Sequence, residues 1–228
     1  MVGIWRKLVA GSESRPTRLH DALGQRASIS RVFRNLPRAF ASGALRVAWG
    51  RLPERPWISY DAQRHIAAFL ASRPGARVLE FGSGQSTRWY AERCAHLVSV
   101  ESNSEWHARI SRQLSGLSHV DYRAAPEREA FASPELDGLY DLVMIDGPWR
   151  DACVDTALRV LAPGGIIYLD NSDKADNPSE GDVPAARCEF IAFAEREGLP
   201  WREFSDFAPA QFFVQRGLMV GPGVTRPN

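Results

Sequence analysis

From Trp57 onward, short β-rich runs alternate with stretches in which apolar residues recur at helical spacing. Parallel strands need a long crossover between them, usually a helix, so this alternation predicts a parallel sheet covered by helices. The expected strands span residues 77–81, 97–101, 119–124, 140–145, 165–169, 200–207 and 211–215. The expected helices span residues 59–72, 86–95, 104–114, 126–131, 151–161 and 184–197.

The last two expected strands are separated only by Ala208, Pro209 and Ala210. So short a connection cannot hold a crossover helix, and these strands should form an antiparallel hairpin. The predicted fold class is therefore α/β, a Rossmann-like, doubly wound sheet of seven strands, mostly parallel, with a C-terminal antiparallel hairpin. We assign residues 57–216 to this domain, residues 1–56 to a basic N-terminal helical arm, and the Gly- and Pro-rich residues 217–228 to a loose tail.

Charge divides the chain in the same place. Residues 1–56 hold ten Arg and one Lys against three acidic residues, a net charge of +8, and the rest of the chain carries −7. Apolar residues at helical spacing lie among these arginines, and Pro37 and Gly43 are expected to bend or break the helix. Three interpretations stay open: a lid packed on the sheet domain, a helix that meets a membrane surface or an anionic partner, and an organelle transit peptide. Nucleic-acid binding also stays open, although no groove-reading motif accompanies the charge.

Several classes of protein are disfavoured. Cys94, Cys153 and Cys188 form no CxxC pair, which argues against a zinc knuckle or a disulfide framework and fits a reducing compartment. No apolar run approaches the roughly 18 residues of a membrane-spanning helix, and the N-terminal apolar stretch is too short for a secretion signal. The expected location is the cytoplasm, at a membrane periphery if the arm binds one. The lack of a GxSxG elbow leaves hydrolase chemistry unsupported.

A glycine turn follows the first expected strand, in the segment RVLEFGSGQST at residues 77–87. Small residues let a ligand approach the backbone at Gly82 and Gly84, and the helix that follows offers free N–H groups. Glu101 ends the second strand, where a carboxylate can bind both hydroxyls of a ribose. The sequence therefore predicts a nucleotide-type ligand at the carboxyl edge of the sheet.

Two ligands suit this turn, a dinucleotide and S-adenosylmethionine. The dinucleotide fingerprint GxGxxG would need a third glycine where Thr87 stands. The Glu80 carboxylate beside the turn would repel a pyrophosphate and favour a cationic amino or sulfonium group. A nicotinamide-dependent oxidoreductase and a non-catalytic nucleotide-binding module remain the alternatives from other classes.

At this point the sequence resembles the class I S-adenosylmethionine-dependent methyltransferases over about residues 57–216. VLEFGSGQST resembles their first motif and VSVES their acidic second-strand motif. YDLVMIDGPWR and LAPGGIIYLDNSD resemble the fourth- and fifth-strand motifs, and the terminal hairpin also fits. Ser86 stands in place of the third glycine of the first motif.

The resemblance implies where the cofactor would bind. The methionine part would contact residues of the glycine turn, the ribose would contact Glu101, and the adenine would lie near Ser102, Asn103 and Ala124-Ala125. The expected cofactor-binding set is Glu80, Gly82, Ser83, Gly84, Ser86, Thr87, Glu101, Ser102, Ala125 and Asp146.

Acidic and amide side chains end the next two expected strands: Asp146 after the fourth, and Asp170 with Asn171 after the fifth. The parallel sheet would deliver all three to one edge, and such an all-oxygen set suits Mg²⁺. A bound Mg²⁺ would lower the pKa of a substrate hydroxyl, which suits methyl transfer to oxygen. The sequence thus suggests a metal set of Asp146, Asp170 and Asn171, and a metal-free methyltransferase is left open beside it.

This pattern is similar to that of the cation-dependent, catechol-type O-methyltransferases, in which Asp146, Asp170 and Asn171 match the metal ligands. The sequence departs from that family where a lysine base is expected, because Trp149 stands there with Arg150 beside it. Arginine cannot act as a base, so either the metal alone would acidify the hydroxyl or Lys174 or Asp173 would assist.

The expected catalytic residues are therefore Asp146, Trp149 and Lys174, with Trp149 either stacked on a flat substrate or packed in the core. The polar segment 172–183 is expected to be a mobile loop over the site. The expected reaction is S-adenosylmethionine-dependent O-methylation of a small polyol, sugar or phenol, with N-methylation and protein methylation as alternatives. The sequence leaves a homodimer open.

Overall fold

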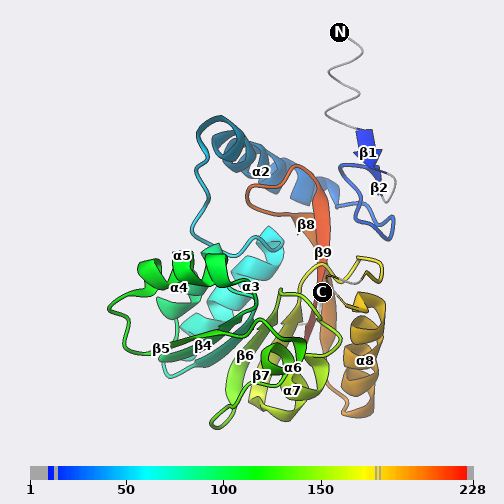
Figure 1. The fold of residues 1–228 in the computed structure, drawn as a ribbon. Helices are drawn as coiled ribbons and strands as arrows, with labels where there is room; N and C mark the ends of the chain where they lie inside the picture. Colours follow the sequence, from blue (N-terminus) through cyan, green and yellow to red (C-terminus); the bar gives the residue numbers. More distant parts are fainter. Residues whose placement is uncertain (1–9, 13–14, 178, 180, 225–228) are drawn as a thin grey trace.

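The computed structural model describes residues 10–12, 15–177, 179 and 181–224, and its centre is a seven-stranded sheet (Figure 1). The strand order is β5-β4-β3-β6-β7-β9-β8, with β3 and β6 near the middle. Strands β3 to β7 run parallel to one another, and β9 is antiparallel to both β7 and β8. The predicted sheet, with its antiparallel C-terminal hairpin, is confirmed. The strands are β3 (Arg77–Phe81), β4 (His96–Glu101), β5 (Val120–Ala124), β6 (Tyr140–Ile145), β7 (Leu161–Leu169), β8 (Trp201–Phe207) and β9 (Val214–Val220).

Helices cover both faces of this sheet because successive strand residues point to opposite sides. On one face Val78 of β3 packs with apolar residues of α3 and α4, whereas its neighbour Leu79 faces α6, α7 and α8 on the other. These helices, and α5 beside β4 and β5, lie within a few residues of the predicted positions. They are α3 (Tyr60–Ala71), α4 (Gln85–Ala91), α5 (Ser104–Leu114), α6 (Arg128–Ala132), α7 (Val154–Arg159) and α8 (Val183–Arg196).

Strand β9 extends further than the sequence suggested. The domain was expected to end at residue 216, with a loose tail after it, but β9 continues through Val220. Leu218 and Val220 enter one core and Met219 the other, so the segment is held by burial on both faces. Gly217 made the end of this strand hard to predict, since glycine is uncommon in strands. Only glycine fits at this position, because the Tyr168 ring occupies the space where a side chain would lie. Residues 225–228 of the expected tail lie outside the described residues.

The arm contains a short hairpin, β1 (Ala10–Ser12) with β2 (Arg15–Thr17), followed by the long helix α2 (Ile29–Trp49). The expected break at Pro37 and Gly43 does not occur, since α2 is one helix that contains both. Its buried residues face the hairpin of β8 and β9, and a Cβ added to Gly43 would lie 2.5 Å from the tip of the Phe212 ring. The absent side chain therefore lets α2 approach the hairpin closely, which offsets the low helix propensity of glycine.

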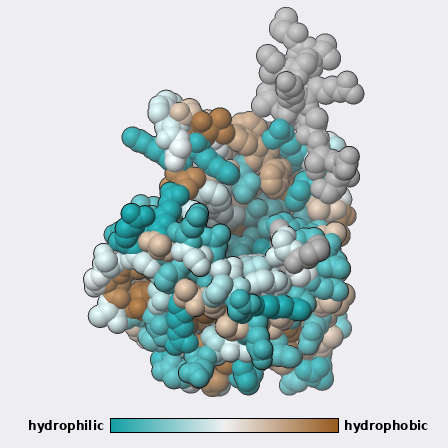
Figure 2. All heavy atoms as spheres, viewed as in Figure 1, coloured by the Kyte–Doolittle hydropathy of each residue, from teal (hydrophilic) through white to brown (hydrophobic). Residues whose placement is uncertain are grey.

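Polar contacts hold α2 in this place across the top of the sheet (Figure 1). The Asn35 amide donates to the Asp206 carboxylate at 2.5 Å, and Arg31 Nε lies 2.6 Å from the Asp61 carboxylate at the start of α3. The outer side of α2 leaves Phe33, Val47 and Trp49 exposed, and Figure 2 shows apolar patches at the top of the molecule. None of the described helices is long and apolar enough to cross a membrane.

Candidate active site

The glycine turn after β3 lies directly against the turn after β6. Gly82 has a φ of 92°, and a Cβ there would stand 2.6 Å from the backbone of Gly147. The backbone N–H of Asp146 donates to the Phe81 carbonyl at 2.9 Å, so the two strand ends are tied together. The side chain of Asp146 is therefore placed at the glycine turn, as the parallel sheet predicted.

Glu80 lies under the turn and is almost fully buried. Its carboxylate accepts hydrogen bonds from the hydroxyls of Ser86, Thr87 and Ser99 at 2.5, 2.7 and 2.7 Å. Burial raises its pKa to about 7, although the three hydroxyl donors oppose that shift. Glu80 thus fastens the start of α4 to β3 and β4. The hydroxyl of Thr87 also accepts from the Gly84 N–H at 2.9 Å, which fixes the conformation of the turn.

Glu101 ends β4 on the other side of the turn. Its Oε2 accepts from the Ser83 N–H at 3.1 Å and from the Ser83 hydroxyl at 2.7 Å, while Oε1 accepts from the Asn103 N–H at 2.7 Å. A carboxylate oxygen can accept two hydrogen bonds, so Oε1 keeps capacity for one further donor, such as a ligand hydroxyl.

Two adjoining cavities open at this edge of the sheet. The larger, of about 850 Å³, extends from the glycine turn along α5, and we call it the α5 cavity. The smaller, of about 260 Å³, lies on the side of the arm, and we call it the turn cavity. Gly82, Ser83, Trp106 and Asp146 line both. A combined space of this size suits a nucleotide-type ligand.

The structure brings most of the expected cofactor residues to these cavities. Ser102 and Asn103 join Glu101 in the α5 cavity, and Gly84 and Ser86 line the turn cavity. Expected residues that line neither of the two are Glu80, Thr87, Ala124, Ala125, Trp149, Asp170, Asn171 and Lys174.

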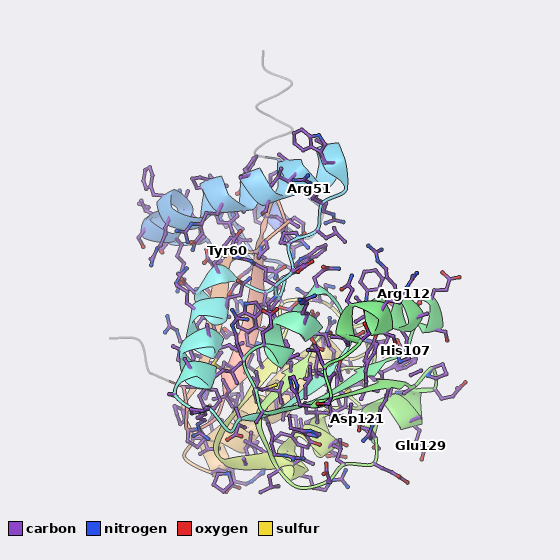
Figure 3. The ribbon with its side chains drawn as sticks, turned by 90° about the vertical axis from the view of Figure 1, so that its left-hand side faces the viewer. Arg51, Tyr60, His107, Arg112, Asp121 and Glu129 are labelled. Atoms are coloured by element: carbon purple, nitrogen blue, oxygen red, sulfur yellow. The ribbon has the colours of Figure 1, made fainter. Side chains whose placement is uncertain are left out.

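Several lining residues were missed from the sequence. The Trp106 indole N–H donates to the Ser83 carbonyl at 3.0 Å, which places its ring between the two cavities. Arg55 and Trp57 reach the turn cavity from the segment that joins the arm to α3. Arg112, labelled on α5 in Figure 3, lines the outer part of the α5 cavity. No motif marks these positions, because only tertiary packing brings them to the turn.

Behind Asp146 lie a second acid and a buried cation. Arg150 Nη2 is 3.2 Å from Asp146 Oδ1, and the Arg150 side chain is only 4% exposed against 37% for Asp146. Asp170 is buried and hydrogen-bonded to Asp146, and burial together with the charge of Asp146 holds the pKa of Asp170 well above its usual value. Burial and the charge of Asp146 thus disfavour ionisation of Asp170, while Asp146 pairs with Arg150.

The remaining expected residues are spread around this pair. Asn171 has a φ of 50° and its carbonyl accepts from the Lys174 N–H at 2.9 Å, which forms a tight turn after β7. Trp149 packs against the core and meets the Phe131 ring edge-on, with ring centroids 5.8 Å apart. Of the expected loop over the site, Ser179 lines the α5 cavity. Trp149 is thus partly buried against the core, and its stacking on a substrate stays a prediction.

The expected metal ligands do not fit Mg²⁺ as the structure arranges them. A cation would need Asp146 Oδ1 accessible, but the Arg150 guanidinium lies 3.2 Å from that oxygen. Over the described part of the chain, no group of three or more His, Cys, Asp or Glu side chains could hold a metal ion. Arg150 instead pairs with one of the two expected metal carboxylates, Asp146.

Comparisons with known proteins agree with this fold. A family model described as a methyltransferase domain matches residues 79–172. The O-methyltransferase TomG from Streptomyces achromogenes, involved in tomaymycin synthesis and solved with SAM, is 17% identical, covers 96% of this chain and 94% of its own, and has a TM-score of 0.56. An O-methyltransferase from Bacillus cereus, solved with SAH, is also 17% identical, covers 82% of this chain and 89% of its own, and has a TM-score of 0.58. No curated protein matches this sequence.

The chain therefore has the fold of the class I methyltransferases. Within that fold, the segment that matches the methyltransferase-domain model, residues 79–172, contains the glycine turn, Glu101, Asp146 and Arg150.

Proposed function

We propose that this protein transfers a methyl group from S-adenosylmethionine to a hydroxyl oxygen of a small molecule. The observation that carries the proposal is the convergence of the glycine turn, Glu101 and Asp146 on two adjoining cavities. The solved O-methyltransferases with the same fold, one with SAM and one with SAH, support the choice of cofactor and of an oxygen acceptor.

The residues present fit this cofactor. Glu101 Oε1 has capacity to accept from a ribose hydroxyl, and Ser102 and Asn103 line the same cavity where an adenine would lie. Ser83 and Ser86 offer polar contacts to the methionine part, and the carboxylate of Asp146 would attract its ammonium group or the sulfonium. When bound, S-adenosylmethionine supplies an electrophilic methyl group on a positively charged sulfur.

The chain itself must position the acceptor and remove a proton. Asp146 is the accessible carboxylate of the pair and faces both cavities, so it accepts the hydroxyl proton as the oxygen gains the methyl group. Arg150 pairs with Asp146 and orients its carboxylate, and Asp170 is hydrogen-bonded to Asp146 from the buried side. Positioning of the two reactants in the cavities between α5 and the arm supplies the rest of the rate enhancement.

Calorimetric titration with S-adenosylhomocysteine tests the cofactor assignment. We expect micromolar binding to the wild type and a loss of about tenfold or more in Glu101→Gln, because a charge-assisted hydrogen bond to a ribose would be lost. Glu105→Gln is the matched control. Glu105 also lines the α5 cavity, but in the described part of the chain no hydrogen bond joins its side chain to the glycine turn. No binding to the wild type would contradict the proposed function.

A further inference from the structure

A third cavity lies between the arm and the methyltransferase domain, with a volume of about 700 Å³. Its walls come from α2, the segment that follows it, α3, α4 and the turn between β8 and β9. Figure 3 shows Arg51 beyond the end of α2 and Tyr60 at the first turn of α3, on opposite sides of this space. We call it the arm cavity.

The lining of the arm cavity carries a strong positive charge. It includes the five arginines Arg38, Arg51, Arg55, Arg64 and Arg93, and no acidic residue of the described chain lines it. Arg64 pairs with Asp61, and Arg93 Nη1 lies 3.5 Å from Glu92. In the part of the chain that the structure describes, no carboxylate pairs with the side chains of Arg38, Arg51 or Arg55. The cavity therefore holds at least three guanidinium groups that no carboxylate of the described residues contacts.

Several arginine side chains lie close to one another at the arm cavity. The pKa of Arg64 is lowered, first by burial and then by the charge of Arg34, with a smaller effect of Arg38, while the charge of Asp206 opposes the shift. Guanidinium groups that repel one another gain free energy when an anion enters, and each can form two parallel hydrogen bonds with a phosphate or carboxylate.

Apolar side chains line the wall of the arm cavity between these arginines. Leu45, Leu52, Trp89 and Pro209 are among them, and the Arg93 guanidinium lies 4.2 Å from the centre of the Trp89 ring. A simple inorganic ion would leave this surface uncovered, so the lining suits a molecule with an anionic group and an apolar or aromatic body.

The arm cavity adjoins the cofactor region. Arg55 lines both the arm cavity and the turn cavity, and the turn cavity contains Asp146 and the glycine turn. Arg46 of α2 lies 5.1 Å over the Trp57 ring, which holds this joining segment against the arm. A ligand in the arm cavity could thus extend past Arg55 toward Asp146.

We propose that the arm cavity binds the methyl acceptor, and that this acceptor is a soluble small molecule with a phosphate or carboxylate group on an apolar body. This inference rests on the proposed function, since it places an acceptor beside the methyl-donor site. The arm then determines which acceptors are methylated, with Arg38, Arg51 and Arg55 as specificity-determining residues.

Calorimetric titration of the full chain with 1-naphthyl phosphate tests the proposal, with 1-naphthol as the uncharged analogue. We expect 1-naphthyl phosphate to bind about tenfold or more tightly than 1-naphthol, and Arg38→Gln/Arg51→Gln to remove that preference. Arg196→Gln, an exposed arginine on α8, is the matched control and should leave the affinity within about twofold of the wild type. Equal affinities for the two ligands, or equal losses in both variants, would overturn the proposal.

Further binding measurements separate this inference from its alternatives. S-adenosylhomocysteine should bind the double variant as it binds the wild type, and saturation with it should leave the site for 1-naphthyl phosphate available. Loss of 1-naphthyl phosphate binding on saturation with S-adenosylhomocysteine would refute an acceptor site beside the cofactor. Failure of S-adenosylhomocysteine to bind at all would refute the proposed function, but it would not affect the assignment of the anion site. Binding to phosphatidic acid vesicles without binding of 1-naphthyl phosphate would instead assign the charge to a membrane surface.

Discussion

Arg150 Nη2 lies 3.2 Å from Asp146 Oδ1, and the arginine side chain is buried while the aspartate side chain reaches the cavities. Three residues of sequence separate them, on the turn that follows β6. This pair places a fixed positive charge behind the carboxylate that faces the proposed reaction. It also neutralises the edge of the sheet where two acids, Asp146 and Asp170, would otherwise repel each other.

Removal of this cation should destabilise the protein. We expect Arg150→Gln to lower the free energy of unfolding by about 2 kcal/mol, because two neighbouring acids lose their buried counter-charge. Arg128→Gln is the control, since Arg128 makes a more exposed pair with Asp151 at 2.7 Å and should cost less than about 1 kcal/mol. Urea denaturation measures both, and equal effects of the two substitutions would show that the Arg150 pair has no special role.

The same pair predicts how the protein responds to Mg²⁺. We expect titration with MgCl₂ to give no saturable heat with the wild type, because Arg150 contacts Asp146 where a cation would bind. S-adenosylhomocysteine binding should likewise be unchanged by EDTA. A saturable Mg²⁺ heat that Asp170→Ala abolishes would instead support the metal set predicted from the sequence.

Glu80 should make stability depend on pH. Its pKa is raised from 4.5 to about 7 in the folded state, so the folded protein holds this proton where the unfolded chain has lost it. The stabilising contribution is therefore present in acid and is lost as the pH rises from about 4.5 through about 7, by up to about 3 kcal/mol.

Glu80→Gln isolates that contribution, since glutamine has a similar shape and does not titrate. We expect the stability advantage of the wild type over Glu80→Gln to be larger at about pH 5.5 than at about pH 8.5 in the absence of cofactor. Denaturation curves at the two pH values measure it. An advantage that grows with pH would mean that Glu80 is ionised in the folded protein throughout this range.

Gly82 should be required for the contact between the two turns. We expect Gly82→Ala to cost about 3 kcal/mol of stability, because its Cβ would lie 2.6 Å from Gly147 and its φ is 92°. It should also weaken S-adenosylhomocysteine binding by about tenfold or more, since the turn would move away from Asp146.

Gly138→Ala separates the two causes. Gly138 also has a positive φ, of 76°, but a Cβ there meets nothing within 4 Å. Its substitution should cost only the backbone strain, about 1 kcal/mol, and leave S-adenosylhomocysteine affinity unchanged. If both glycine variants lose the same stability and neither loses affinity, the close contact of Gly82 with Gly147 does not shape the site.

The sequence by itself determined the sheet, its antiparallel end and the approximate position of the glycine turn, Glu101 and Asp146. These features follow from local patterns, because the period of apolar residues and the position of glycine act over a few neighbouring residues. The predicted end of β9 was wrong because Gly217 interrupts the apolar pattern. That glycine is required by the close packing of the distant Tyr168 ring.

Only the tertiary structure decided what surrounds those residues. Ser99 of β4 donates a hydrogen bond to Glu80 of β3, and Trp106 lines both cofactor cavities. Arg55 lines both the arm cavity and the turn cavity. The buried Arg150 likewise pairs with Asp146, and the buried Asp170, whose pKa is raised, is hydrogen-bonded to the same aspartate. Burial and long-range proximity set the charge state of such groups, and both arise only when segments far apart in the sequence pack together.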